Sequence, residues 1–136
     1  MIYLLDTNAC MVYLNKKLSG VRQRLETLSP SDIAVCSVVK AEIFYAGIRT
    51  NNPQNTLRMQ QEFFDRFLSL PFDDRAARIY SQIRATLMPV GSPIGPYDLQ
   101  IASIAIAYNL VLVTSNMPEY SRVRELLWEN WQESFS

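Results

Sequence analysis

The stretch "IYLLD" at residues 2–6 decides the fold class of this chain. Its apolar residues run without interruption into a carboxylate, Asp6, and the polar residues Thr7 and Asn8 follow. A short apolar run that ends in polar residues is typical of a strand buried on both faces, as the strands of parallel sheets are. The chain therefore opens with a predicted buried strand whose carboxyl end carries an acid.

Similar runs continue along the chain. Further buried strands are predicted at "IAVCSVV" (33–39) and "LVLVTSN" (110–116), with a short strand at "LPF" (70–72) and an edge strand within "LLWENW" (126–131). Apolar residues spaced by three or four predict helices from about residue 9, over 18–28, after Ser37, over 56–70, from Asp73 or Asp74 to Leu87, and from Gly95 through Asp98. Strands that alternate with helices imply one α/β domain over residues 1–136, with a parallel sheet covered on both faces.

Composition limits the class of protein. The net charge is zero, from 13 basic and 13 acidic residues, which argues against a protein that coats nucleic acid nonspecifically and leaves room for a local basic patch. No apolar run reaches the roughly 18–20 residues needed to cross a bilayer, and no signal-peptide pattern is present, so a cytoplasmic protein is expected. Cys10 and Cys36 lie in apolar segments and are expected to be buried free thiols.

The sequence contains no histidine. This excludes Ser-His-Asp and Cys-His nucleophiles and paired-histidine ribonuclease chemistry, and it leaves a poor ligand set for zinc. An enzyme with this sequence must therefore use Asp, Glu, Lys, Ser, Thr or Tyr, or a bound hard cation.

Polar side chains gather after the predicted strands. Asp6 ends the first strand, Glu42 lies in the first turns of the helix after 33–39, and Asp98 lies near the start of its helix. Asn116 ends the 110–116 strand, and Glu119 follows it. Because loops at the carboxyl ends of parallel strands form the ligand crevice of an open sheet, these side chains are predicted to meet at one edge.

Carboxylates that meet in this way need a compensating charge. Two of them about 4 Å apart repel by roughly 1 kcal/mol in water and about 4 kcal/mol near a protein surface. A helix N-terminus returns only about 0.3–1 kcal/mol. A hard divalent cation resolves the conflict, since Mg²⁺ is bound by one or two carboxylates together with waters and a substrate phosphate. Such an ion supplies a nucleophile from water at neutral pH without histidine.

Each acid also has a purely structural interpretation. Asp6 is suited to cap the helix that follows it, Asp98 to complement its helix dipole, and Glu42 and Glu119 to lie on the surface. Five other acids are expected in caps, turns or solvated helix faces: Asp32, Glu62, Asp65, Asp73 and Asp74.

Four segments together resemble a known family. The stretches "YLLDTNAC" (3–10), "SVVKAEIFYAG" (37–47), "GSPIGPYDLQIASIAIAYNLVLVTSN" (91–116) and "WENW" (128–131) are similar, in order and spacing, to PIN-domain ribonucleases of the VapC toxin type. The "G-x-P-x-G-P-Y-D" form of residues 91–98 further resembles the subgroup that cleaves initiator tRNA in its anticodon stem-loop. The resemblance implies a three-layer α/β/α fold with a central parallel sheet, and a toxin of a type II toxin–antitoxin system that acts as an Mg²⁺-dependent endoribonuclease. It also implies Mn²⁺ as a possible substitute and inhibition by a cognate VapB-type antitoxin.

The resemblance also assigns roles at single positions. Asp6 and Asp98 match the metal-binding aspartates, and Glu42 matches the glutamate of the same pocket. Asn116 stands where many PIN nucleases have an aspartate, and Glu119 matches a nearby acid of the VapC form. The implied metal site therefore consists of Asp6, Glu42 and Asp98, completed by Asn116 or Glu119.

Candidates for contacts with RNA and partners surround these residues. The basic side chains that could hold phosphates are Lys16, Lys17, Arg22, Arg24, Lys40 and Arg49. The hydroxyl and amide groups that could orient a phosphate or an acid are those of Thr7, Asn8, Thr114 and Ser115. The aromatic residues Phe44, Tyr45 and Tyr97 are expected in the core rather than as base-stacking platforms. Apolar helices that bear Tyr13, Phe63, Phe64 and Phe67 could leave a groove for an antitoxin helix or a second copy, and a homodimer is expected.

Other interpretations stay open. A receiver-like signalling module would need a lysine at a late strand end, where this chain has Thr114 and Ser115. An aspartyl phosphatase would need a second acid two residues after the first, where Asn8 stands. A non-catalytic PIN-like binding module, and a PIN toxin acting on ribosomal or messenger RNA, are separated from tRNA cleavage by an activity assay.

Overall fold

A computed structural model describes residues 1–91 and 94–132 of the chain. Its strands form a parallel sheet in the order β3-β2-β1-β4-β5. They are β1 (Tyr3–Leu5), β2 (Ile33–Cys36), β3 (Leu68–Leu70), β4 (Val111–Val113) and β5 (Trp128–Glu129). The predicted parallel sheet is confirmed, and the first strand of the chain lies at its centre.

Helices occupy every connection between strands. They are α1 (Thr7–Asn15), α2 (Gly20–Glu26), α3 (Ser37–Ile48), α4 (Pro53–Phe64), α5 (Asp74–Leu87), α6 (Pro96–Ala107) and α7 (Met117–Tyr120). Single 3-10 turns precede β2, at Pro30–Asp32, and follow α5, at Met88–Val90.

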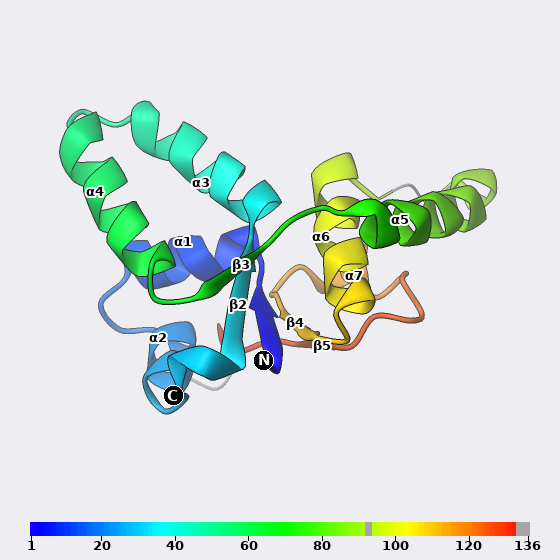
Figure 1. Cartoon of the computed structure of the whole chain (residues 1–136), viewed down its shortest axis with the longest axis horizontal. Helices are drawn as coiled ribbons and strands as arrows, with labels where there is room; N and C mark the ends of the chain where they lie inside the picture. Colours follow the sequence, from blue (N-terminus) through cyan, green and yellow to red (C-terminus); the bar gives the residue numbers. More distant parts are fainter. Residues whose placement is uncertain (92–93, 133–136) are drawn as a thin grey trace.

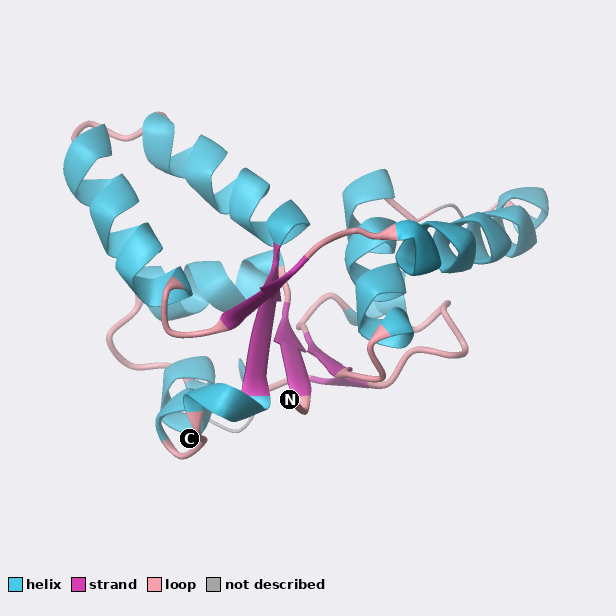
Figure 2. Ribbon diagram, in the orientation of Figure 1, coloured by secondary structure: helices cyan, strands magenta, loops and turns pink. Residues whose placement is uncertain are grey.

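The helices form two layers, one on each side of the sheet (Figure 1). Helices α1 to α4 lie on one side and α5 to α7 on the other, with the strands between them (Figure 2). The chain moves one way across the sheet from β1 to β3 and the opposite way from β3 to β5. Right-handed crossovers then place the two sets of helices on opposite faces. The expected three-layer α/β/α arrangement is confirmed.

The sheet has a topological switch point between the neighbouring strands β1 and β4. β1 continues toward β2 on one side and β4 toward β5 on the other, so the loops leaving these neighbouring strands separate. Such a switch point leaves a crevice at the carboxyl ends of the strands. Helix α3 starts directly after β2, and α6, which returns to β4, starts at the same edge (Figure 1). The topology therefore gathers two strand ends and two helix starts at one place.

The inner strands explain the apolar runs of the sequence. Every residue of β1 and β2 is buried, which is the environment that a strand between two helical layers requires. Cys10 and Cys36 are buried free thiols, as predicted. In the part of the chain that the structure describes, no helix combines the length and the apolar character needed to span a membrane.

The predicted helix over 56–70 is two elements. Helix α4 ends at Phe64, and Leu68–Leu70 form the edge strand β3, two residues before the strand that "LPF" suggested. The apolar spacing of Phe63, Phe64 and Phe67 runs across this boundary and mimics a continuing helix. Residues 68–70 form a strand because pairing with β2 gives their backbone groups hydrogen-bond partners.

The strand predicted at 33–39 is shorter than expected. β2 ends at Cys36, which is the N-cap of α3, so Ser37 is the first residue of the helix and not its cap. The β-branched Val38 and Val39 lie in the first turn of α3, where packing overrides their preference for strands.

The buried face of α3 also differs from the prediction. The helix buries Val39, Ile43 and Gly47. Tyr45, which was expected in the core, is 62% exposed, and the apolar side chain of Ile48 is 59% exposed. The helix is apolar on most sides, so its periodicity does not point to a single face.

Asp73 fastens α5 to α6. Its Oδ1 accepts the N–H of Ala76 at 2.9 Å as the N-cap of α5. The hydroxyl of Tyr108, at the end of α6, donates to Oδ2 at 2.6 Å. These hydrogen bonds, that of Tyr108 foremost, hold the pKa of Asp73 below its ordinary value. Because α6 also carries Asp98, this contact helps to fix the helix that bears a candidate acid.

Replacing Tyr108 with phenylalanine is expected to lower the melting temperature at neutral pH, because it removes the donor to Asp73. The folded-state pKa of Asp73 lies below its ordinary value of 3.8, so the stabilisation is present above that value and is lost as the pH falls through the lowered pKa. The difference in melting temperature between wild type and Y108F should therefore shrink below about pH 4. A difference that stays constant in a calorimetric series from neutral to acid pH would contradict this account.

Candidate active site

Asp6 lies at the carboxyl end of β1 and begins α1. Its Oδ1 accepts the N–H of Ala9 at 2.8 Å, so it is the N-cap that its position allows. The side chain is nevertheless 4% exposed. Burial and, to a smaller extent, the charge of Glu42 raise the pKa of Asp6 to about 6, against the lowering effect of hydrogen bonds from Thr114 and Ala9. A cap alone does not require a carboxylate in so unfavourable a place, since asparagine and serine cap helices as well.

Glu42 joins the first and third helices of the chain. It is half-buried on α3, and the hydroxyl of Thr7 at the start of α1 donates to its Oε1 at 2.8 Å. Its negative charge raises the pKa of both Asp6 and Asp98. The structure therefore turns this glutamate toward the other acids at the edge of the sheet.

Asp98 lies in the first turn of α6 and contacts the segment that forms α7. Burial, a hydrogen bond with Glu119 and the charge of that residue together raise its pKa to about 7. The hydroxyl of Tyr120 donates to Oδ1 at 3.3 Å and acts in the opposite direction. Tyr120 is 1% exposed, and the sequence reasoning assigned it no role. Its position directly after Glu119 was the only signal.

Glu119 and Asp98 direct carboxylate oxygens at the same point. The N–H of Gly95 donates to Oε1 of Glu119 at 3.4 Å. Oε2 is buried and accepts no hydrogen bond from the described residues. A Cβ at position 95 would lie 3.6 Å from Oδ2 of Asp98 and 3.9 Å from Oε2 of Glu119. Two carboxylates this close together need a proton or a cation between them, and carboxylate oxygens are the ligands that hard divalent cations prefer.

The loop after β4 supports the acids with neutral groups. The side chain of Thr114 hydrogen-bonds Asp6, and its Oγ1 accepts the N–H of Asn116 at 2.9 Å. Nδ2 of Asn8 donates to Oγ of Ser115 at 2.6 Å and ties α1 to this loop. Asn116 is half-buried at the start of α7, and its side chain makes no capping bond there.

The acids form two pairs rather than a closed cage. Asp98 and Glu119 are in hydrogen-bond contact, and Glu42 acts through its charge on Asp6 most directly and on Asp98 as well. Over residues 1–91 and 94–132, no group of three or more Asp, Glu, His or Cys side chains already has the spacing of a metal site. The structure thus brings the predicted acids to one edge, within range of each other's charge, while their side chains are not yet closed around a common centre.

Basic residues near the start of the chain serve the fold. The guanidinium of Arg22 lies 3.9 Å from the ring centroid of Tyr13. Arg24 donates to the hydroxyl of Tyr3 at 3.3 Å, at the first residue of β1 and away from the strand end that bears Asp6. These two arginines therefore do not flank the acids as the sequence suggested.

The aromatic residues proposed for a partner groove are packed inward. Phe63, Phe64 and Phe67 are 4%, 0% and 8% exposed, and Tyr13 stacks on Phe63 with ring centroids 4.7 Å apart. These side chains fill the core beneath α1 and α4, and a partner groove between the helices that bear them stays a prediction.

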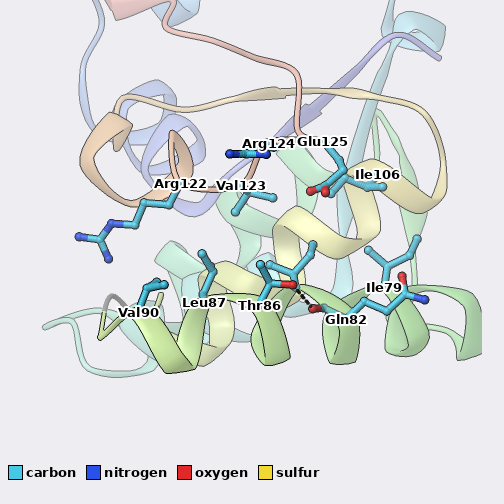
Figure 3. A pocket seen from close by; sticks show the side chains of 11 residues that line it. Ile79, Gln82, Thr86, Leu87, Val90, Ile106, Arg122, Val123, Arg124 and Glu125 are labelled. Atoms are coloured by element: carbon cyan, nitrogen blue, oxygen red, sulfur yellow. Dashed lines mark hydrogen bonds between the residues drawn. The ribbon is translucent and has the colours of Figure 1, made fainter.

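Another part of the molecule contains a cavity that none of these five polar residues lines. A cavity of about 530 Å³ opens between α5 and the segment 121–125, and Figure 3 shows Ile79, Leu87, Val90 and Ile106 among its lining residues. Its one carboxylate, Glu125, stands beside arginines rather than other acids. The cavity therefore offers no set of carboxylates for a metal.

The chain is similar to proteins of known family over almost its whole length. The family model described as "PIN domain" matches residues 3–126. The protein named "tRNA(fMet)-specific endonuclease VapC" from Salmonella typhimurium is 34% identical over 95% of this chain and 97% of the relative. "Ribonuclease VapC2" from Rickettsia felis is 36% identical over 98% of this chain and 100% of the relative.

Solved structures agree with these sequence relatives. The toxin in the DNA-bound VapBC structure from Salmonella typhimurium superposes with a TM-score of 0.90 at 32% identity, over 96% of this chain and 98% of the other. The VapBC2 structure from Rickettsia felis, bound to a DNA fragment from its promoter, gives 0.89 at 35% identity, over 96% and 99%. Fold, spacing and sequence identity agree along the same stretch, so the chain belongs to the PIN-domain family and, within it, to the VapC ribonucleases.

Proposed function

We propose that this protein is the toxin of a type II toxin–antitoxin system and a Mg²⁺-dependent endoribonuclease that cuts initiator tRNA in its anticodon stem-loop. One observation carries the metal-dependent chemistry. Oε2 of Glu119 is buried with no hydrogen-bond donor among the described residues, and the carboxylate of Asp98 faces the same point. The tRNA substrate is supported by the name of the Salmonella relative at 34% identity and by the "G-x-P-x-G-P-Y-D" form of residues 91–98 in the sequence.

Asp6, Glu42 and Asp98 would hold the Mg²⁺ ion, with Mn²⁺ as a possible substitute. When bound, such an ion lowers the pKa of water and offsets negative charge on the phosphodiester. The raised pKa values of Asp6 and Asp98 reflect burial and neighbouring carboxylates, and a cation between these groups favours their ionised forms. The buried acids thereby provide the negative charge that retains the ion beside RNA.

Neighbouring side chains position these acids. Thr7 holds Glu42 and Thr114 holds Asp6 through their hydroxyl groups. Glu119, whose Oε2 accepts no hydrogen bond from the described residues, or the amide of Asn116 would orient the attacking water or a second ion. In-line attack on phosphorus then releases a 5′-phosphate and a 3′-hydroxyl.

The partner follows from the same relatives. The structural neighbours with the highest similarity quoted above are toxin–antitoxin complexes, which supports a VapB-type antitoxin as the partner of this chain. We propose a homodimer of the toxin within that complex, and a tRNA substrate places its action in the cytoplasm. A mass measurement of the purified protein with and without antitoxin tests the assembly.

The decisive experiment treats tRNA with purified protein freed of antitoxin, with Mg²⁺ or with EDTA. A single cut in initiator tRNA that requires Mg²⁺ and that Mn²⁺ restores after EDTA is expected. Sequencing of RNA ends after brief expression identifies the target in the cell. Cuts confined to ribosomal or messenger RNA would assign a different substrate, and cleavage unaffected by EDTA would refute the metal-dependent mechanism. Absence of any cleavage would favour a non-catalytic binding module.

A further inference from the structure

We propose that the cavity between α3 and α6 binds one unpaired nucleobase of the RNA, held between the rings of Tyr45 and Tyr97. The inference rests on the proposed function and extends it, because it assigns the residues that recognise the nucleotide beside the cut. It follows from the exposure of two tyrosines, the position of the cavity and the chemistry of its lining.

Tyr45 and Tyr97 are exposed although the sequence placed them in the core. They are 62% and 59% exposed, whereas Phe44, between α3 and α4, packs edge-to-face on Phe64 with ring centroids 5.5 Å apart. Tyr45 belongs to α3 and Tyr97 to α6, yet both line one cavity of about 560 Å³. Two aromatic rings from different helices are thus available at the surface of the same cavity.

The cavity adjoins the candidate catalytic acids. Glu42 is one of its lining residues, and Tyr97 directly precedes Asp98 in the first turn of α6. An occupant of the cavity therefore lies next to the carboxylates that face the phosphodiester. In a bound RNA chain, that position belongs to a nucleotide adjoining the cut.

The lining favours a base over a phosphate. Its residues in the described chain are Ser37, Val38, Ala41, Glu42, Tyr45, Tyr97 and Gln100. None of these is basic, and the one charged side chain, Glu42, is negative, so a phosphate would be repelled. Aromatic rings stack on the flat face of a base, and the Gln100 amide and Ser37 hydroxyl can hydrogen-bond its edge.

Arg49 adds a positive charge at the outer side of this site. Its guanidinium carbon lies 5.5 Å from the ring centroid of Tyr45, one helical turn further along α3. This contact supports the Tyr45 ring and leaves the cation near the surface, where the RNA backbone would run with its base turned inward. The arrangement requires an unpaired base, because a base within a duplex does not expose its face to two tyrosines.

The test measures RNA affinity apart from cleavage. A fluorescent single-stranded RNA decamer and versions with an abasic site at each position in turn are titrated by anisotropy in Ca²⁺ without Mg²⁺. The variants are Y97L, Y97F, Y45L and Y45F, with Ile48→Ala as the matched control. Ile48 is equally exposed on α3, at 59%, and does not line the cavity.

For wild type, one abasic position should reduce affinity about 10-fold, which is within the range for loss of one stacked base. Y97L and Y45L should bind the intact decamer about 10-fold more weakly and should be insensitive to that abasic position. The phenylalanine variants and I48A should behave as wild type, since stacking does not need the hydroxyl.

Several results would overturn the base site. The first is that Y97L binds the intact decamer as tightly as wild type does. The second is that the abasic position weakens the binding of Y97L as much as it weakens the binding of wild type. The third is that Y97F loses as much affinity as Y97L. If Y97L binds RNA normally but binds the antitoxin more weakly, the cavity holds a peptide instead. A wild type that cleaves no RNA would refute the proposed function, while the affinity comparison would still decide the base site.

Discussion

Replacing Asp98 with asparagine should abolish nearly all RNA cleavage, with a fall in rate of at least about 10²-fold. A bound divalent cation contributes several kcal/mol of charge stabilisation to such a reaction, and each 1.36 kcal/mol is a factor of ten in rate. The substitution keeps the size of the side chain and its place in the first turn of α6, and it removes the negative charge that faces the same point as Oε2 of Glu119. Initial rates on tRNA in Mg²⁺ measure the effect.

Asp74 supplies the matched control for this substitution. Like Asp98, it is an acid in the first turn of its helix, where it complements the positive end of the helix dipole. It is exposed and belongs to no cluster of acids. Asp74→Asn should therefore leave cleavage unchanged. If D98N and D74N were equally active, Asp98 would be a helix-terminal acid and nothing more.

Replacing Asp6 with asparagine should abolish cleavage and also make the metal-free protein more stable. Burial raises the pKa of Asp6 from 3.8 to about 6. At neutral pH this shift corresponds to roughly 3 kcal/mol of unfavourable free energy, at 1.36 kcal/mol per pKa unit. Asparagine keeps the cap of α1 without the charge. We expect a gain of about 2 kcal/mol, seen as a melting temperature higher by several degrees in EDTA.

The size of this stabilisation depends on pH. A carboxyl whose folded-state pKa is raised stabilises the fold relatively more below its ordinary pKa of 3.8 and loses that advantage as the pH rises through about 6. The advantage of D6N should therefore be full above about pH 6 and absent below about pH 4. Mg²⁺ should stabilise wild type and not D6N.

Asp73 is the control for the role as a cap. It caps α5 through Ala76 as Asp6 caps α1 through Ala9, but the hydrogen bond from Tyr108 holds its pKa below the ordinary value. Asp73→Asn should accordingly lower the melting temperature, the reverse of D6N. If both variants lowered the melting temperature equally, burial of the charged Asp6 side chain would not destabilise the fold. The interpretation of its raised pKa would then be contradicted.

The sheet could be predicted from the sequence because its inner strands are enclosed on both sides. Residues 3–5 and 33–36 must be apolar at every position, and polar residues mark where each strand leaves the core. The edge was harder to predict. β3 is half exposed, and Leu68 is 56% accessible. The sequence of β3 therefore has no pattern of apolar residues that distinguishes it from the end of helix α4.

The acids were predictable because topology alone sends strand ends and helix starts to one edge. What the sequence could not provide is the direction in which each helix turns its side chains. α3 and α6 are apolar on nearly every side, and the choice of which face to bury depends on neighbours distant in sequence. Tyr45, Tyr97 and Tyr120 show the result, two on the surface and one buried against Asp98.

The central position of β1 has a consequence for the order of events during synthesis. Tyr3 pairs with Ile33 on one side but with Val111 on the other, so the strand that is made first waits for one of its two neighbours until most of the chain exists. Asp6, which follows β1, reaches the side chain of Thr114 only after that pairing. We therefore expect a chain truncated before residue 111 to be inactive as a nuclease, because it lacks β4 as well as Asn116 and Glu119.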